Sequence, residues 1–138
     1  MNDQSLVQID QILLTFTTVD PTKIETMLSY DPSQELFKEL VKIFNVEMKD
    51  KLILIKKEFE VRNFEELGKL AHRIRSTSLN LGTTRLAEIF KRLEYLSAEQ
   101  NISSSEVQFL IQAAEKEYVF AAEKLNSYLQ PKTEGQAE

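Results

Sequence analysis

Residues 105–129, SEVQFLIQAAEKEYVFAAEKLNSYL, carry the clearest helical pattern in this chain of 138 residues. Their apolar residues recur in an unbroken alternation of four and three positions, which is the period of one face of an α-helix. A stripe of this kind is typical of a helix that packs along its whole length, so the segment predicts one wall of a helical bundle. The stripe consists of Val107, Ile111, Ala114, Tyr118, Ala121, Leu125 and Tyr128.

Residues 33–63 predict a second long helix. The segment contains neither glycine nor proline, and its apolar residues recur at three- and four-residue steps. Ser33 is a candidate N-cap for this helix, which would be roughly 40 Å long. The apolar residues that show this spacing are Leu36, Leu40, Ile43, Phe44, Leu52, Ile55 and Phe59.

Two shorter helices are expected between these two. Asn63 followed by Glu66 is similar to a capping box, so one helix begins there. It should end near Asn80, because Gly82 tolerates the left-handed conformation that follows many helices. The next helix is expected to start at Thr84 and has its apolar residues on one face. These residues are Leu86, Ile89, Leu93 and Leu96.

Together these segments predict an all-α fold, because no stretch alternates for long with a period of two and every connection is short. The simplest packing is an up-down-up-down four-helix bundle over residues 33–130. Residues 1–32 are expected to form an N-terminal helical extension that packs on the bundle. Residues 131–138 are polar and aperiodic, which predicts a disordered tail.

The N-terminal extension contains two apolar segments. Asp20 precedes Pro21 as a candidate N-cap, which predicts a short helix through Leu28. Residues 6–19 predict an amphipathic helix with one apolar face. The sequence leaves open whether the bundle or another molecule covers that face. Its residues are Ile9, Ile12, Leu13 and Phe16.

The composition argues against several classes of function. With no cysteine, one histidine and three glycines, the chain lacks the residues for a disulfide framework, a two-histidine metal site or a glycine-rich phosphate loop. Its net charge of -5 is the wrong sign for nucleic-acid binding. Residues 9–19 are too short and too polar to cross a bilayer. The acidic start is unlike a secretory signal, so we expect a cytoplasmic protein without membrane attachment.

His72 lies on the polar face of its predicted helix. At about 100° per residue, Leu67, Leu70 and Ile74 fall on the opposite side, so the imidazole is expected to point to solvent. Small residues and a leucine on the same face would let another protein approach closely, although an incidental surface histidine would give the same pattern. The residues that share this face are Glu65, Gly68, Lys69, Arg75, Ser76 and Leu79.

Residues 67–82, LGKLAHRIRSTSLNLG, resemble the signature of histidine-containing phosphotransfer (HPt) domains, and the similarity continues at Leu93-Glu94. Members have an alanine and the histidine, then a hydrophobic, a basic, a small and two hydroxyl or small residues, and a hydrophobic-glycine pair. Two positions depart from this pattern, because Ser76 stands where glycine is commonest and Thr83 where alanine is usual. The positions are filled by Ala71, His72, Ile74, Arg75, Ser76, Thr77, Ser78, Leu81 and Gly82.

The resemblance implies a phosphorelay intermediate. Nε2 of His72 would accept a phosphoryl group from the phosphoaspartate of a receiver domain, in a response regulator or a hybrid histidine kinase, and pass it to a second receiver. Arg75 and Ser76 would stabilise the phosphoryl group. Mg²⁺ would lie in the receiver, so this chain is expected to need no metal, cofactor or ATP-binding element of its own. The residues expected to dock the partner are Glu65, Gly68, Lys69, Arg73 and Leu79.

Two alternatives stay open. The dimerisation helix of a sensor histidine kinase also has a basic residue three places after its histidine, but Arg73 and Thr77 stand where that family usually has an acid and a proline. A non-catalytic helical adaptor or scaffold would instead bind a partner through the His72 face. The sequence does not decide the direction of transfer or the oligomeric state, and a monomer is the simplest expectation.

Overall fold

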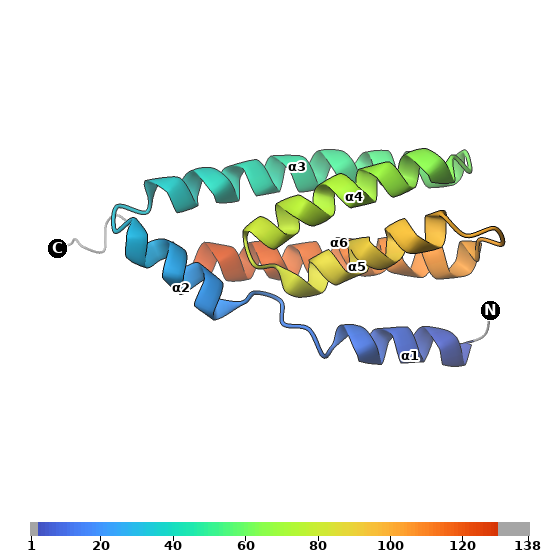
Figure 1. Cartoon of the computed structure of the whole chain (residues 1–138), viewed down its shortest axis with the longest axis horizontal. Coiled ribbons are helices and arrows are strands. Elements are labelled where there is room, and N and C mark those ends of the chain that lie inside the picture. The colour runs from blue at the N-terminus through green and yellow to red at the C-terminus, as the bar shows by residue number, and fades with distance from the viewer. Residues whose placement is uncertain (1–2, 130–138) are drawn as a thin grey trace.

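The computed structural model describes the chain from residue 3 to residue 129, with side chains from residue 5 onward (Figure 1). This part of the chain contains six helices and no strand, so the predicted all-α fold is confirmed. The predicted tail, residues 131–138, lies outside the described residues. The helices are α1 (Asp3–Leu13), α2 (Pro21–Tyr30), α3 (Glu35–Glu60), α4 (Phe64–Asn80), α5 (Thr84–Ser97) and α6 (Ser104–Ser127).

Helices α3 to α6 form a four-helix bundle, in which each helix runs opposite to the one before it (Figure 1). α4 packs on α3 and α5, and α6 packs on α5 and α3, which closes the bundle. Phe44, Ile55, Phe90 and Leu110 are fully buried in its centre. Burial of side chains of this size contributes about 1.5–3 kcal/mol each. The predicted boundaries at residues 32 and 130 stay a prediction.

Two helix starts agree with the signals predicted from the sequence, and a third helix has a cap of the same kind. The side chain of Asp20 accepts a hydrogen bond from Thr22 N, and that of Asn63 accepts one from Glu66 N. Ser103 caps α6 in the same way. Each cap satisfies a backbone amide that has no partner inside the helix, which is worth about 1 kcal/mol. α2 ends at Tyr30, two residues after the predicted end.

The start of α3 differs from the prediction. Ser33 is not its N-cap, because the helix begins after Gln34, which has a left-handed backbone with φ 64°. Ser33 Oγ accepts from Glu35 N at 3.3 Å, and the Asp31 carboxylate accepts from Leu36 N at 2.8 Å. The two side chains therefore divide between them the capping that the sequence assigned to Ser33 alone.

The inner face of α3 also differs. Leu36 and Ile43, which share the apolar spacing of this segment, are exposed, whereas Phe37 and Met48 are buried. Leu36 lies about 100° around the helix from Phe37. Because apolar residues surround much of this helix, three- and four-residue steps can be counted along more than one face, and tertiary packing selects one of them.

The N-terminal segment packs on the bundle. Ile9 and Leu13 of α1 are buried in the common core, and α1 contacts α5. Ile12 is exposed and Phe16 lies beyond the end of α1, so the predicted four-residue apolar face is wrong in those two positions. The sequence left open whether the bundle or another molecule covers this face. In the structure, the chain's own core covers Ile9 and Leu13.

The turn between α4 and α5 follows its sequence signals. Gly82 has a left-handed φ of 70°, the conformation that glycine adopts without strain. Thr83 is buried and donates its hydroxyl hydrogen to Ser78 O at 2.9 Å. The threonine that departs from the HPt pattern therefore closes the end of α4. No helix in the described part of the chain is both long enough and apolar enough to cross a membrane.

Candidate functional site

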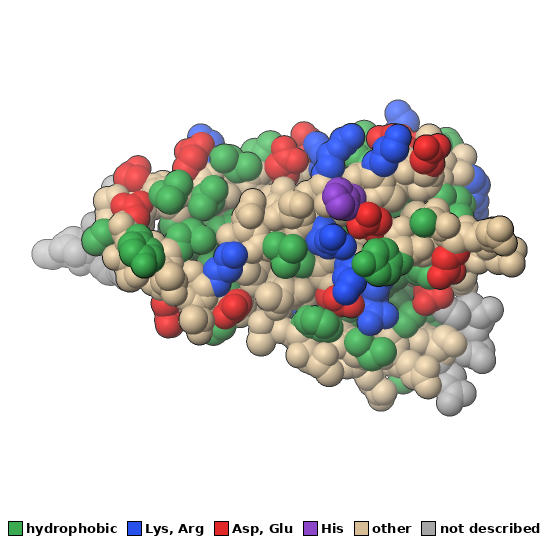
Figure 2. Space-filling view, in the orientation of Figure 1, with side chains coloured by type: hydrophobic (Ala, Val, Ile, Leu, Met, Phe, Trp, Pro, Cys, Tyr) green, Lys and Arg blue, Asp and Glu red, His purple; other side chains and the backbone are tan. Residues whose placement is uncertain are grey.

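His72 lies in the middle of α4, on the outer surface of the bundle. Leu70, Ala71 and Ile74 are buried in the core, and this burial turns the imidazole to the outside. The His72 side chain is 58% exposed. Figure 2 shows the histidine at the molecular surface, with basic and acidic side chains gathered beside it.

Glu94 of α5 fixes the orientation of the imidazole. His72 Nδ1 lies 2.9 Å from Glu94 Oε2, within hydrogen-bond distance. An ionised carboxylate can only accept a hydrogen bond, so Nδ1 carries the hydrogen in this pair. The neutral ring then has its lone pair on Nε2. In this tautomer Glu94 orients the ring so that Nε2 is the nitrogen with the free lone pair.

Arg75 lies on the other side of the same carboxylate. Its NH1 nitrogen is 3.4 Å from Glu94 Oε1, and both side chains are about a quarter exposed. The guanidinium offsets the negative charge that Glu94 brings next to His72. The sequence predicted Arg75 one turn from His72, and the structure adds that the two residues share a carboxylate from the neighbouring helix.

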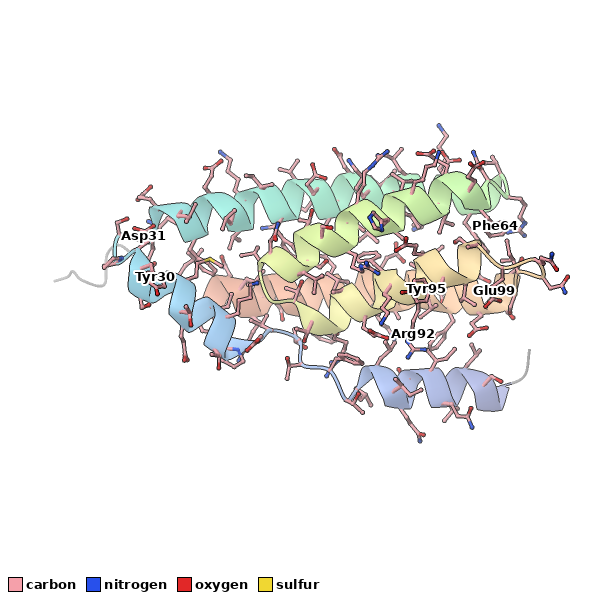
Figure 3. All side chains as sticks on the ribbon, in the orientation of Figure 1. Tyr30, Asp31, Phe64, Arg92, Tyr95 and Glu99 are labelled. Carbon is pink, nitrogen blue, oxygen red and sulfur yellow. The ribbon has the colours of Figure 1, made fainter. Side chains whose placement is uncertain are left out.

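A groove of about 590 Å³ opens beside His72, between the first half of α4 and the last half of α5. We refer to it as the His72 groove. Gly68 forms part of its floor, where a Cβ atom would lie 3.4 Å from Ser97 Cβ. Phe64, marked in Figure 3, stands at the start of α4 and contributes an apolar side chain. The groove therefore joins an apolar surface to the imidazole.

The predicted docking residues divide into two groups. Glu65, Gly68, Lys69 and Arg73 line the His72 groove, whereas Leu79 lies on the far side of Arg75 and lines a different groove. Lys69 is also 3.9 Å from Glu65, an exposed pair of the kind that contributes little to stability. Ser76 is exposed on α4 but lines neither groove.

The role of Glu94 as a partner of His72 could not be predicted from the sequence. The Leu93-Glu94 pair was part of the HPt resemblance, but nothing in the sequence showed which α5 side chain would face the imidazole. Phe64, Ser97 and Ala98 of the groove were missed for the same reason. These residues come together only because α4 and α5 pack antiparallel in one particular register, and that register cannot be read from the sequence.

The described residues contain no cluster of three or more histidine, cysteine, aspartate or glutamate side chains that could hold a metal ion. Glu94 is the carboxylate that contacts His72, and it is already shared with Arg75. The arrangement provides an exposed imidazole, a carboxylate that orients it and basic side chains beside it. These features suit transfer of a phosphoryl group, which depends mainly on positioning and charge.

The site is thus an exposed imidazole, held by a carboxylate from the neighbouring helix, on an antiparallel helical bundle. A comparison with protein-family models matches residues 39–125 to the Hpt domain, which is more than half of the chain. The chain belongs to the Hpt domain family. Searches of curated proteins and of solved structures find no significant match.

Membership of this family gives the chain a role in histidine phosphotransfer within the phosphorelays of two-component signalling. Hpt domains are carriers of the phosphoryl group rather than kinases, and they interact with receiver domains. The family match begins after α2, so the N-terminal 38 residues lie outside it.

Proposed function

We propose that His72 accepts a phosphoryl group from the phosphoaspartate of one receiver domain and passes it to another. The observation that carries this proposal is the bond between His72 Nδ1 and Glu94 at 2.9 Å on an imidazole that is 58% exposed. In the neutral ring this contact puts the hydrogen on Nδ1 and the lone pair on Nε2, the nitrogen that a partner would approach. The receivers belong to response regulators or hybrid histidine kinases.

The transfer needs no added base, because the attacking nitrogen carries no hydrogen. The Nε2 lone pair of His72 attacks the phosphorus of the aspartyl phosphate, the N–P bond forms, and the P–O bond to the aspartate breaks. The aspartate leaves as a carboxylate, while the imidazole keeps its hydrogen on Nδ1 and gains a positive charge. Glu94 stabilises that charge through the Nδ1 contact. Return of the group to a second receiver reverses these steps.

Arg75 and Ser76 are the residues that we assign to phosphoryl stabilisation. Glu94 alone would repel the incoming anion, and Arg75 counters this because its guanidinium lies 3.4 Å from the Glu94 carboxylate. Ser76 follows His72 by one helical turn and is exposed, so its hydroxyl can donate to a phosphoryl oxygen. Mg²⁺ in this scheme is held by the receiver.

The partner docks over the His72 groove and the surface around it. Gly68 keeps the backbone of α4 accessible, Lys69 and Arg73 supply positive charge near an acidic receiver site, and Glu65 and Leu79 lie at the edges. The monomeric state and the cytoplasmic location that the sequence predicts are part of the proposal.

The test is transfer from a purified receiver domain of the same organism, labelled on its aspartate with radioactive acetyl phosphate. We expect acid-labile label on the wild-type chain and none on His72→Gln, which keeps the size of the side chain but removes the nucleophile. Ser105→Ala, a change on the remote α6, is the control and should accept label like the wild type. Label on His72→Gln would overturn the proposal, and receiver binding without any label would favour a helical adaptor.

A further inference from the structure

A second groove lies on the other side of the contact between Arg75 and Glu94. It has a volume of about 480 Å³ and runs between the last half of α4 and the stretch of α5 from Thr84 to Tyr95. We refer to it as the Phe16 groove, because Phe16 joins Arg75, Leu79, Lys91 and Tyr95 in lining it. Arg75 is therefore common to the groove and to the carboxylate that orients His72.

Phe16 comes from the connection between α1 and α2, and this connection is held firmly on α5. Arg85 Nε donates to the carbonyl oxygens of Phe16 and Leu13, at 2.9 and 3.0 Å. The next residue, Thr17, accepts at its carbonyl oxygen from Arg85 N at 2.9 Å and from the Thr84 hydroxyl at 2.7 Å. Four hydrogen bonds thus fix the backbone on which the Phe16 ring is mounted.

The Arg85 anchor is itself supported from inside the bundle. Arg85 NH1 lies 3.4 Å from Oε1 of Glu117, a carboxylate of α6 that is almost fully buried. A buried charge of this kind needs its partner, so the pair keeps Arg85 in place. The position of Phe16 is consequently set by α5 and α6 together, rather than by the connection alone.

The surface of the Phe16 groove combines apolar groups with two cations, Arg75 and Lys91, and one carboxylate, Glu88, whose charge is offset by Arg92 at 3.0 Å. Leu79 is 47% exposed and Tyr95, marked in Figure 3, is 59% exposed. Lys91 Nζ lies 5.8 Å from the centre of the Tyr95 ring, a cation–π contact that presents positive charge beside the aromatic surface. Exposed aromatic and leucine side chains with adjacent cations suit a protein partner that has an apolar patch and an acidic neighbourhood.

We propose that the Phe16 groove is a second contact site for the receiver domain and that Phe16, Leu79 and Tyr95 help to select which receiver binds. The inference rests on the proposed function and deepens it. A receiver that places its acidic site over His72 covers Arg75, and the groove begins at that residue. Phe16 lies outside the matched residues 39–125, so selectivity would come partly from the N-terminal extension.

The test measures how the rate of transfer depends on receiver concentration. For Phe16→Ala and Tyr95→Ala we expect the concentration at half-maximal rate to rise roughly fivefold or more, as for loss of an aromatic interface contact. The maximal rate should stay the same. Tyr30→Ala is the matched control for Tyr95→Ala, because Tyr30 is an 85% exposed tyrosine at the end of α2 that lines neither groove.

A second donor separates docking from chemistry. Phosphoramidate phosphorylates imidazoles directly and needs no docking surface, so both groove variants should be labelled by it at the wild-type rate. Tyr95→Ala keeps the test decisive if Phe16→Ala fails to fold, since Tyr95 is largely exposed.

The two hypotheses fail in different ways. If the wild-type chain takes label from receivers and both groove variants show its concentration dependence, the second contact site is overturned and the relay stands. If no receiver labels the wild-type chain while phosphoramidate does, the relay itself is overturned. A shift shared equally by Tyr30→Ala would also overturn the groove proposal, because it would reflect a general loss of exposed aromatic surface.

Discussion

His72 Nδ1 on α4 lies 2.9 Å from Glu94 Oε2 on α5, so the free nitrogen of the imidazole is defined by the packing of two neighbouring helices. A side chain from a second helix removes the freedom of the ring to present either nitrogen. The carboxylate also lies where the positive charge of a phosphorylated imidazole would develop.

Substitution of Glu94 should therefore change the chemistry of His72 without changing the fold. Glu94→Gln keeps an acceptor oxygen for Nδ1 but loses the charge, and we expect transfer to slow about threefold to tenfold. Glu94→Ala loses both and should slow transfer more than tenfold, which corresponds to about 1.4 kcal/mol or more of transition-state stabilisation. Rates of labelling by phosphoramidate, together with the imidazole nitrogen resonances of each variant, measure this effect. Equal rates for all three proteins would show that Glu94 has no part in the transfer.

The helix ends were largely predictable because they depend on local groups. Asp20, Asn63 and Gly82 act on amides and turns within a few residues, and their signals are visible in the sequence. The inner face of α3 was not, because Leu36 and Phe37 are both apolar and only contact with the neighbouring helices selects between them.

The candidate site, too, was predictable where it depends on one helix and unpredictable where it depends on packing between helices. Exposure of His72 followed from the period of α4, since the apolar residues lie on the opposite side of one helix. The Glu94 contact joins residues that are 22 positions apart and depends on how α4 and α5 align. The Phe16 groove needs three separate segments, and the Arg85 anchor that positions it has no local sequence signal.

Arg75→Ala should slow transfer from a receiver by about fivefold to tenfold, because Glu94 would then repel the phosphoryl group without compensation. Helicity measured by circular dichroism should be unchanged, since Arg75 is not part of the core. Lys49→Ala removes the same charge from an exposed position on α3 and serves as the control. Identical transfer rates for Arg75→Ala and Lys49→Ala would reduce Arg75 to an ordinary surface charge.

Asp31, labelled in Figure 3 at the turn before α3, should make the folding stability of the protein depend on pH in the acid range. Hydrogen bonds from the Ser33 hydroxyl and from the Leu36 backbone amide lower the pKa of Asp31 below its ordinary value of 3.8. A group with a lowered pKa in the folded state stabilises the protein above the unfolded-state pKa, and this contribution is lost as the pH falls through the folded-state value.

The variant Asp31→Asn should accordingly unfold at a lower temperature than the wild type at pH values well above 3.8, and the gap should narrow as the pH falls below it. Thermal unfolding followed by circular dichroism over this range measures the difference. Transfer to His72 is the internal control and should be unaffected, because Asp31 lines neither groove. A gap that stays constant with pH would show that the Asp31 charge does not stabilise α3.

Gly68 should separate stability from docking. Its Cβ position has ordinary van der Waals contacts, 3.4 Å from Ser97 Cβ and 3.8 Å from Glu94 O, so Gly68→Ala should raise the free energy of unfolding by about 0.5–1 kcal/mol through helix propensity.

Gly68→Leu should also fold, but its side chain would fill the His72 groove and slow receiver-driven transfer by roughly tenfold, as a clash at a close protein contact does. Gln108→Leu adds the same side chain at an exposed position on α6 as the control. Labelling of Gly68→Leu by phosphoramidate should match the wild type, and a parallel loss with both donors would mean that the leucine disturbs His72 itself rather than the approach of the receiver.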